Sequence, residues 1–475
     1  MGIYPRFSPA RADGFMRKEV PRDMYKLSQI AEEYQKKLVT PQEAAAIVKS
    51  GDRVSYGLGC SAPYDTDKAL ADHINNDGLK DVEIIDATLI QDHPFFTYTE
   101  TESNDQVRFV SGHFNGFDRK MNKAGRCWFM PLLFNELPKY WSHKKVDVAI
   151  FQVHPMDKWG NFNLGPQVAD LRGILKSADK VIVEVNQKMP KALGYETELN
   201  IADVDMIVEG SNPDMPIVPN KPSTPVDDKI ASFVVPMIKD GSTLQLGIGG
   251  VPSAIGHKLA ESDVKDLSGH TEMLVDPYVE LYEAGKITGK KNRDRGKIMY
   301  TFAGGTQRLY DFIDDNQIVF NAPVNYVNNI NVVASIDNFV SINSCINLDL
   351  YGQVCAESAG YRHISGTGGA LDFAQGAYLS EGGQGFICVH STRKLKDGSL
   401  ESLIRPTLTP GSVVTTPRSA VHYIVTEYGV ALLKGQSTWQ RAEALINIAH
   451  PDFREDLIKE AEKMGIWTKT SKTEY

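Results

Sequence analysis

IVKSGDRVSYGLG, at residues 47–59, and MIKDGSTLQLGIG, at residues 237–249, carry the same structural signals in the same order. In each stretch an apolar helical segment ends, a glycine turns the chain, a short strand follows and a glycine-rich bend closes it. One such match can arise by chance. The parallel continues, however, in two further pairs of segments, 147–160 with 338–352 and, at a somewhat wider spacing, 181–185 with 386–389. Three matches in one order, about 190 residues apart, predict duplicated domains.

The pattern of apolar residues between these stretches predicts the fold class. Short β-branched runs without strict alternation are typical of strands buried on both faces of a sheet, and they occur at residues 146–151, 181–185 and 332–336. Helical spacing appears between them, at residues 70–74 and 253–260, where Pro252 suits the first helical position. The sequence therefore predicts an α/β protein made of two similar open α/β domains.

The domain boundary is predicted from composition. Residues 210–227 are rich in Pro and Ser and lack periodicity, as expected of a linker, so the boundary is placed near residue 222. This gives an N-terminal domain at residues 1–222 and a C-terminal domain at residues 223–475. The tail beyond Ile466 is expected to be frayed.

The bulk composition limits the partners that the protein can have. A net charge of -9 without a long block of like charges argues against a nucleic-acid groove, although small anionic ligands remain open. No apolar run approaches the roughly 20 residues of a membrane helix, and residues 1–26 lack an apolar signal core, so a cytoplasmic protein is expected. The five cysteines contain no CxxC pair and are interpreted as reduced thiols.

Two glycine-rich bends are candidate binding loops: GIGG at residues 247–250 and GTGG at residues 366–369, each of which leads into a helical segment. Glycine lets backbone N–H groups turn inward, and a helix N-terminus adds partial positive charge, so such loops can hold a phosphate or an oxyanion. Each can equally be an ordinary turn from a strand to a helix. Pro252 and Leu371 stand where a dinucleotide fingerprint needs its third glycine, and no GxxxxGK[ST] motif occurs.

Glu272 is the candidate nucleophile. It interrupts an apolar, strand-like run just before a helix, for which Asp276 is the expected cap, Pro277 the first turn and Gly285 the stop. A residue at a strand end of an open sheet faces the usual ligand crevice. Alone, such a Glu is more often solvated or in a salt bridge. A carboxylate can, however, attack a thioester without a general base, because it is ionised at pH 7.

Other catalytic arrangements find less support. AESAG at residues 356–360 fails the GxSxG pattern, no HExxH motif occurs, and the eleven histidines lack ligand spacing. A basic cluster follows the Glu272 helix and is either a solvated loop or a shallow seat for a nucleotide phosphate; it consists of Lys286, Lys290, Lys291, Arg293, Arg295 and Lys297.

Together these residues resemble the acetyl-CoA hydrolase/transferase branch of the class I CoA-transferases, and within it the butyryl-CoA:acetate CoA-transferases. The resemblance runs from about Tyr34 to about Glu462 and leaves residues 1–25 without an assigned role. It is densest in HTEMLVD (270–276), DNFVSIN (337–343), DLYGQV (349–354), and ISGTGG (364–369) with LDF (371–373).

The resemblance implies the CoA-transferase fold and a role for each candidate residue. Glu272 would be the nucleophile of a ping-pong reaction that passes through a glutamyl-CoA thioester and moves CoA between butyryl-CoA and acetate. The oxyanion and thioester would bind at Gly366, Thr367, Gly368 and Gly369, and CoA at Gln245, Gly247, Ile248, Gly249 and Gly250. CoA would be a substrate, with no metal or other cofactor. Small carboxylates are the expected partners, and a homo-oligomer is expected.

Three alternatives remain open at this point. The same fold can support an acyl-CoA hydrolase, in which water intercepts the intermediate, or a CoA-binding regulatory protein without catalysis. A 4-hydroxybutyrate CoA-transferase is a further alternative. That branch usually carries a His and an acidic residue in the region that reads GLGCSAP at residues 57–63 here, which favours an apolar acyl pocket.

Overall fold

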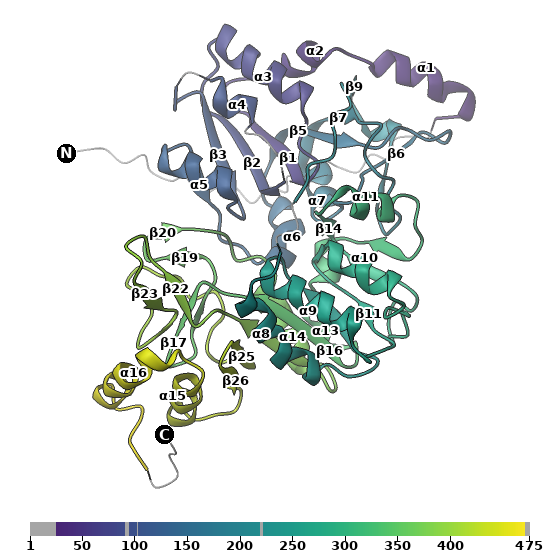
Figure 1. Ribbon diagram of the computed structural model, residues 1–475. Coiled ribbons are helices and arrows are strands. Elements are labelled where there is room, and N and C mark those ends of the chain that lie inside the picture. Colours follow the sequence, from purple (N-terminus) through teal and green to yellow (C-terminus); the bar gives the residue numbers. More distant parts are fainter. Residues whose placement is uncertain (1–24, 91–94, 102, 219–221, 471–475) are drawn as a thin grey trace, which may run out of the picture.

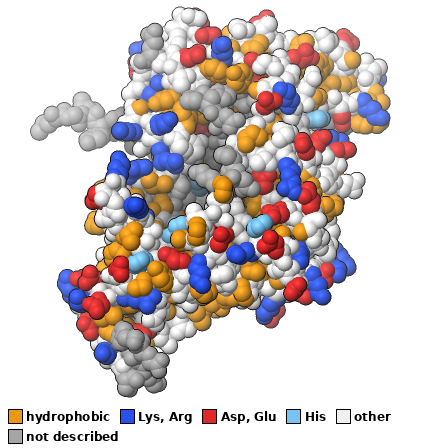
Figure 2. All heavy atoms as spheres, viewed as in Figure 1, with side chains coloured by type: hydrophobic (Ala, Val, Ile, Leu, Met, Phe, Trp, Pro, Cys, Tyr) orange, Lys and Arg blue, Asp and Glu red, His pale blue; other side chains and the backbone are white. Residues whose placement is uncertain are grey.

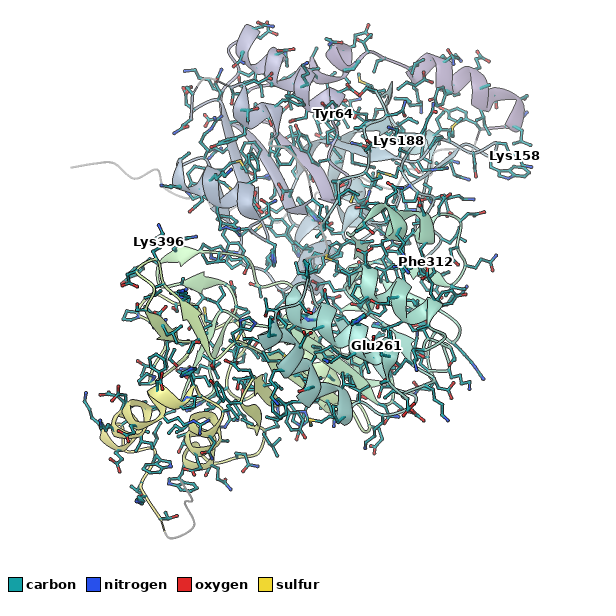
Figure 3. The ribbon with its side chains drawn as sticks, viewed as in Figure 1. Tyr64, Lys158, Lys188, Glu261, Phe312 and Lys396 are labelled. Carbon is teal, nitrogen blue, oxygen red and sulfur yellow. The ribbon has the colours of Figure 1, made fainter. Side chains whose placement is uncertain are left out.

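The computed structural model describes residues 25–90, 95–101, 103–218 and 222–470. We call residues 25–218 the N-terminal half and residues 222–470 the C-terminal half. Figure 1 shows the N-terminal half at the top, in purple and blue, and the C-terminal half below it, with a yellow-green lobe at the lower left. In Figure 3, Tyr64 and Lys188 mark the first half, and Glu261 and Phe312 mark the second. The N-terminal extension, residues 1–24, lies outside the described residues.

The N-terminal half is built on a seven-stranded parallel sheet with the order β4-β3-β2-β1-β5-β7-β9. Its strands are β1 (Arg53–Gly59), β2 (Val82–Leu89), β3 (Val107–Ser111), β4 (Cys127–Phe129), β5 (Val146–Val153), β7 (Ala178–Val185) and β9 (Met206–Glu209).

Both faces of this sheet are covered. Along β5, Val148 and Ile150 pack with α2 (Pro41–Ala45), α3 (Asp65–Asn76) and α5 (Gly116–Lys123). Ala149 and Phe151 point the other way, toward α6 (Leu137–Trp141) and α7 (Leu171–Ser177). Apolar residues at successive positions of a strand are therefore all buried, which explains why the sequence shows continuous apolar runs rather than alternation.

The C-terminal half contains a six-stranded sheet with the order β11-β10-β16-β21-β25-β26, parallel except at the β25–β26 edge. Its strands are β10 (Thr243–Leu246), β11 (Ser268–Gly269), β16 (Phe339–Ser344), β21 (Gln384–Cys388), β25 (Tyr423–Thr426) and β26 (Gly429–Leu432). Helices α8 (Pro225–Val234) and α9 (Gly250–Glu261) cover one face, and α13 (Ile330–Ala334) and α14 (Ala370–Leu379) cover the other.

The predicted duplication is confirmed by the strand order. The first pair of matching stretches forms β1 and β10, the second forms β5 and β16, and the third forms β7 and β21. In each sheet these three strands are neighbours in the same order and run parallel. A helix follows the first strand in both, α3 after β1 and α9 after β10. The two similar α/β domains expected from the sequence are thus present.

A further lobe packs beside the second sheet, which the prediction of two domains did not specify. We call it the C-terminal lobe. Its core is formed by residues between Leu348 and Trp467. Its elements are β17 (Asn347–Asp349), β18 (Val354–Cys355), β24 (Ile404–Arg405), α15 (Thr438–Asn447) and α16 (Pro451–Lys463). The hairpin of β22 (Thr392–Lys394) and β23 (Leu400–Ser402) projects from it, with Lys396 at its turn (Figure 3).

Two predictions about local structure are wrong. Residues 332–336 were expected to form a strand but lie in and just after helix α13, because the side chain of Asn329 caps it by accepting from the N–H groups of Asn331 and Val332. The tail beyond Ile466 was expected to fray, yet Trp467 is 2% exposed and packs in the core of the C-terminal lobe. Its indole N–H donates to Glu443, while residues 471–475 lie outside the described residues.

Smaller differences concern helix starts. Helix α9 begins at Gly250, two residues before the expected Pro252. Helix α10 (Asp276–Glu283) begins at Asp276, with Val275 as its N-cap, and Asp276 instead accepts hydrogen bonds from Thr306. Gly285 ends the helix with a φ of +70°, as expected. The boundary predicted near residue 222 borders residues 219–221, which lie outside the described residues. Among the described residues, no helix combines the length and apolar character needed to cross a membrane.

Candidate functional site

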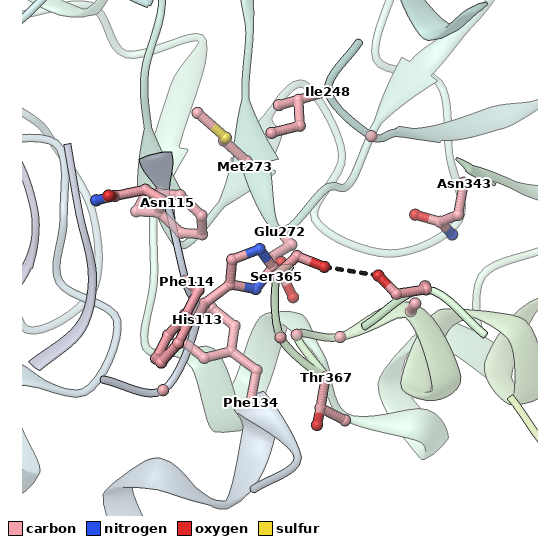
Figure 4. A pocket seen from close by; sticks show the side chains of 18 of the residues that line it. His113, Phe114, Asn115, Phe134, Ile248, Glu272, Met273, Asn343, Ser365 and Thr367 are labelled. Atoms are coloured by element: carbon pink, nitrogen blue, oxygen red, sulfur yellow. Dashed lines mark hydrogen bonds between the residues drawn. The ribbon is translucent and has the colours of Figure 1, made fainter. Parts of the chain in front are cut away.

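A cavity of about 700 Å³ lies where the two halves meet, and both contribute to its walls (Figure 4). The N-terminal half supplies Ile90 and segments 112–119, 130–137 and 217–218. The C-terminal half supplies segments 245–248, 272–273, 343–344 and 365–373 together with Phe302 and Ala356; not every position in these segments faces the cavity. Figure 4 shows Glu272, His113 and Ser365 near its centre, with Met273 and Ile248 above and Phe134 and Thr367 below.

The backbone around Glu272 is fixed on both sides. The N–H of His270 donates to the carbonyl of Leu244, and the N–H of Thr271 donates to the carbonyl of Met299. The carbonyl of Glu272 itself accepts from the N–H of Thr301 at 3.0 Å. The next residues form β12 (Met273–Leu274), which pairs with β14 (Phe302–Ala303). This bracing leaves the carboxylate of Glu272 facing the cavity.

Asn328 holds the carboxylate. Its side-chain N–H donates to Glu272 Oε2 at 2.6 Å. Asn328 follows α12 (Val324–Val327), and the carbonyl of Val327 lies 2.7 Å from His270 Nε2. Burial lowers the pKa of His270 to about 3, so its ring is neutral and Nε2 is assigned as the donor. His270 therefore supports the position of Asn328, and Asn328 in turn orients Glu272.

The GTGG loop at residues 366–369 lies against the same carboxylate. A Cβ on Gly369 would stand 2.1 Å from both Glu272 Oε2 and Asn328 Nδ2, so no larger residue fits there. Gly368 adopts a φ of +53°, which favours glycine, and its carbonyl accepts from the N–H of Phe134 in the N-terminal half. The loop opens helix α14 at Ala370, so its backbone donors and the helix N-terminus face the carboxylate of Glu272.

Burial raises the pKa of two carboxyl groups at the site, those of Glu272 and Asp372. It raises the pKa of Glu272 to about 7, although the hydrogen bonds from Asn328 and the backbone of Gly369 act in the opposite direction. The carboxylate is therefore about half ionised at neutral pH, not fully ionised as its ordinary pKa predicts. Asp372, in the first turn of α14, is fully buried and accepts from Asn135 of the N-terminal half at 2.7 Å. Burial, and then the charge of Glu272, raise the pKa of Asp372 to about 8.

The structure brings together most, but not all, of the candidate residues. Those that line the cavity are Glu272, Gln245, Gly247, Ile248, Gly366, Thr367, Gly368 and Gly369. Gly249 and Gly250 do not line it. Gly249 precedes α9 as its N-cap, and a Cβ on Gly250 would stand 2.6 Å from Asp227 Oδ2, so Gly250 allows α8 and α9 to pack closely.

Gln245 belongs to a small polar group on one wall of the cavity. Its Oε1 accepts from Ser341 Oγ at 2.8 Å and from Asn343 Nδ2 at 3.0 Å, and its Nε2 donates to Asn343 Oδ1 at 3.1 Å. These contacts hold the two amide side chains together. Gln245 and Asn343 thus offer a preformed polar surface on the Gly247 side of Glu272.

Another part of the cavity lining is apolar, as expected of a pocket for a hydrocarbon chain. It consists of Ile90, Met130, Leu132, Phe134, Leu137, Ile217, Val218, Met273 and Phe302. Residues 57–63, from which the apolar pocket was inferred, do not line the cavity themselves. They form a buried turn in which Cys60 Sγ lies 3.2 Å from the hydroxyl of Tyr310.

The basic cluster at residues 286–297 does not reach the cavity either. Lys291 is buried and donates to the carbonyl of Gly269 at 2.9 Å, and Lys290 pairs with Asp266 at 2.7 Å. Arg293 donates to the hydroxyl of Tyr326. The basic cluster therefore contacts other residues of the C-terminal half, which favours its interpretation as a loop over that as a seat for a nucleotide phosphate.

On the face drawn in Figure 2, basic and acidic side chains are interspersed. No group of three or more His, Cys, Asp or Glu side chains within the described ranges could hold a metal ion.

Sequence reasoning missed several residues of the site, among them Asn328 and His113. No motif marks Asn328, because only the fold brings it to Glu272. His113 could have been found, since it is the second residue after β3, and ligands bind at the carboxyl ends of parallel strands.

The fold and the site together define a duplicated α/β protein with a carboxylate in its interdomain cavity, which is the arrangement of CoA-transferases. Two family models match the chain: the acetyl-CoA hydrolase/transferase N-terminal domain at residues 22–219 and the C-terminal domain of the same family at residues 305–461. The chain therefore belongs to the acetyl-CoA hydrolase/transferase family, and the predicted resemblance is confirmed.

Comparisons with individual relatives agree with this family assignment. The chain is 50% identical to the butyryl-CoA:acetate CoA-transferase of Anaerostipes caccae, over 93% of this chain and 99% of the relative. It is 48% identical to the probable butyrate:acetyl-CoA coenzyme A-transferase of Syntrophomonas wolfei, over the same shares. The crystal structure of RipA from Yersinia pestis is similar with a TM-score of 0.83 and 33% identity, and the match covers 92% of this chain and 99% of that one.

Proposed function

We propose that the protein transfers CoA between a short-chain acyl-CoA and a small carboxylate, with butyryl-CoA and acetate as its substrates. The observation that carries the proposal is the Glu272 carboxylate, which Asn328 holds at 2.6 Å against the GTGG loop, inside a cavity lined by both polar and apolar side chains. The names of the relatives from Anaerostipes caccae and Syntrophomonas wolfei support the choice of substrates.

Glu272 is the nucleophile in the proposed cycle. Its carboxylate oxygen attacks the acyl carbonyl carbon, forms a C–O bond and breaks the C–S bond, so that CoA leaves as a thiolate. The thiolate then attacks the glutamyl carbonyl carbon, which forms a glutamyl-CoA thioester and releases the original acyl group as a carboxylate. An incoming carboxylate reverses these two steps. Bonds and charges balance without proton transfer, and the cycle requires neither a metal nor a cofactor besides CoA as substrate.

Each intermediate step passes through a tetrahedral oxyanion, which needs hydrogen-bond donors. The side-chain amide of Asn328 and the backbone N–H groups near Gly369 are the donors nearest to the carboxylate. One oxyanion donor in a site from which water is excluded is typically worth about 3 kcal/mol of transition-state stabilisation. The apolar wall would accept the acyl chain, and the polar wall formed by Gln245 and Asn343 would accept the amide-bearing arm of CoA.

Incubation with butyryl-CoA, with and without acetate, tests the reaction. We expect acetyl-CoA and butyrate to appear only when acetate is present. CoA release that is independent of acetate would instead indicate an acyl-CoA hydrolase, and turnover only with 4-hydroxybutyrate would indicate a hydroxy-acid transferase.

Trapping tests the nucleophile. After addition of acyl-CoA, borohydride or hydroxylamine should modify the peptide that carries Glu272, and Glu272→Gln should abolish both the modification and the turnover. Full activity of Glu272→Gln would end the proposal, and so would a wild-type protein that turns over without forming the adduct.

A further inference from the structure

His113 lies at the centre of the interface between the halves. It follows β3, and its backbone N–H donates to Ser111 Oγ at 3.4 Å. The next residue, Phe114, donates from its N–H to the carbonyl of Ser365 at 3.1 Å. These contacts hold His113 against the GTGG loop of the C-terminal half, and its ring lies beside Glu272 in Figure 4.

The ring of His113 and the carboxylate of Glu272 approach the same glycine. The position of a Cβ on Gly368 lies 3.8 Å from His113 Nδ1 and 3.7 Å from Glu272 Oε1. A Cβ on Gly366 would stand 2.9 Å from the same Nδ1. The imidazole and the nucleophile therefore both adjoin the loop that would bind the thioester.

The imidazole has hydrogen-bonding capacity that the protein does not use. Within the described parts of the chain, neither ring nitrogen of His113 has a hydrogen-bond partner, and the residue lines the cavity. Burial, and then the charges of His363 and Arg119, lower its pKa to about 4. The ring is consequently neutral near pH 7 and carries one N–H donor. A partly buried donor without a protein partner beside a nucleophile is suited to a ligand.

The surroundings favour an anionic ligand. Arg119, on the helix that follows His113, is the only described residue lining the cavity that carries a permanent positive charge. Its guanidinium donates to the carbonyl of Ile364 at 2.6 Å, which anchors it beside the GTGG loop. The segment from His113 to Arg119 thus combines a neutral donor with a positive charge, whereas the facing wall carries Glu272.

We propose that an imidazole N–H of His113 donates a hydrogen bond to the carboxylate of the acyl acceptor and positions it for attack on the glutamyl-CoA thioester. The inference rests on the proposed function. In this step a carboxylate oxygen forms a C–O bond to the glutamyl carbonyl carbon while the C–S bond breaks and CoA leaves as a thiolate. No proton changes place, so a neutral donor is sufficient, and His113 acts through its hydrogen bond alone.

Substitutions of His113 test the assignment. In His113→Leu we expect the KM for acetate to rise about 10- to 100-fold, the effect of losing one hydrogen bond to a charged group. The binding of an unreactive CoA thioether should stay within about twofold. His113→Asn places an amide near the position of Nδ1, and His113→Gln places one near the position of Nε2. One of the two variants should therefore have an acetate KM close to that of the wild type, and this variant identifies the donating nitrogen.

His422→Asn is the matched control. His422 is also partly buried and also has a pKa lowered to about 4 by burial, but it stacks on Tyr423 away from the cavity. The acetate KM of His422→Asn should equal that of the wild type. The inference would be overturned if the acetate KM of His113→Leu were unchanged. It would also be overturned if the only activity that His113→Leu lost were the hydrolysis of the glutamyl-CoA thioester by water. Both results leave the proposed function standing as long as the wild type forms the Glu272 adduct, whereas absence of that adduct would reject the proposed function itself.

Discussion

Burial raises the pKa of Glu272 to about 7, so its charge changes within the physiological range. Only the ionised carboxylate can attack a thioester. We expect kcat/KM for butyryl-CoA to rise with pH, to be half-maximal near pH 7 and to lie about tenfold below its plateau at pH 6.

Asn328→Ala should displace that profile. Removal of its hydrogen bond removes an interaction that lowers the pKa of Glu272, so the midpoint should move to higher pH and the plateau should also fall. Asn325→Ala is the control, because Asn325 lies in helix α12, which ends directly before Asn328, and is exposed. A profile of Asn328→Ala that coincides with the wild-type profile would contradict the assigned contact.

Gly369→Ala tests how closely the GTGG loop must approach the carboxylate of Glu272. The added methyl group would stand 2.1 Å from Glu272 Oε2 and from Asn328 Nδ2, so both side chains must move. Since a small displacement of a reacting group can cost about 100-fold in rate, we expect kcat to fall by at least that factor. The melting temperature should fall much less than in a core variant. Retention of more than a tenth of the activity would show that the loop can move away.

At the scale of elements, helix α8 begins with a reciprocal capping box. Asp227 N–H donates to Thr224 Oγ1 at 3.2 Å, and Thr224 N–H donates to Asp227 Oδ2 at 2.8 Å. Thr224→Ala should lower the free energy of unfolding by about 1 kcal/mol, whereas Thr224→Ser should retain most of it. Urea denaturation measures both. Equal stability of the Ala variant and the wild type would mean that the cap contributes nothing.

Among the helices and strands, some predictions from the sequence are confirmed and others are wrong. The β-branched runs at residues 146–151 and 181–185 form strands as predicted, because both faces of their sheet are covered. The run at residues 332–336 looks the same in sequence but is helical, because Asn329 caps it and Val333 packs against α14. Periodicity alone cannot distinguish the two in so short a segment. Likewise, the burial of Trp467 depends on contacts with α15 that no local sequence pattern predicts.

At the scale of the whole molecule, the duplication could be predicted from repeated stretches, but the completed site could not. Glu272 and the GTGG loop stand in recognisable motifs of the C-terminal half. His113, Phe134 and Asn135 belong to the N-terminal half and meet that motif only through docking of the two halves, as in the hydrogen bond from Asn135 to Asp372. The site is therefore a property of the interface, and its geometry should depend on contacts far from Glu272.

Gly194→Ala tests that dependence. Gly194 forms a parallel bridge with Asn321 across the interface, where Tyr195 N–H donates to the carbonyl of Asn321 and Asn321 N–H donates to the carbonyl of Leu193, both at 2.8 Å. A Cβ on Gly194 would stand 1.9 Å from the carbonyl oxygen of Asn321, and because that atom belongs to the backbone, it cannot rotate away. The halves must therefore separate locally or the bridge must break.

We expect Gly194→Ala to lower the free energy of unfolding by roughly 1–3 kcal/mol, the usual cost of overpacking, and to lower kcat although no residue of the cavity is changed. Gly385→Ala is the control, since Gly385 is a buried glycine of strand β21 in the C-terminal half and its Cβ position has no neighbour closer than 3.7 Å. If Gly194→Ala lost stability but kept full kcat, the cavity would be insensitive to docking, and the positions of His113 and Phe134 would have to be fixed by their own loops instead.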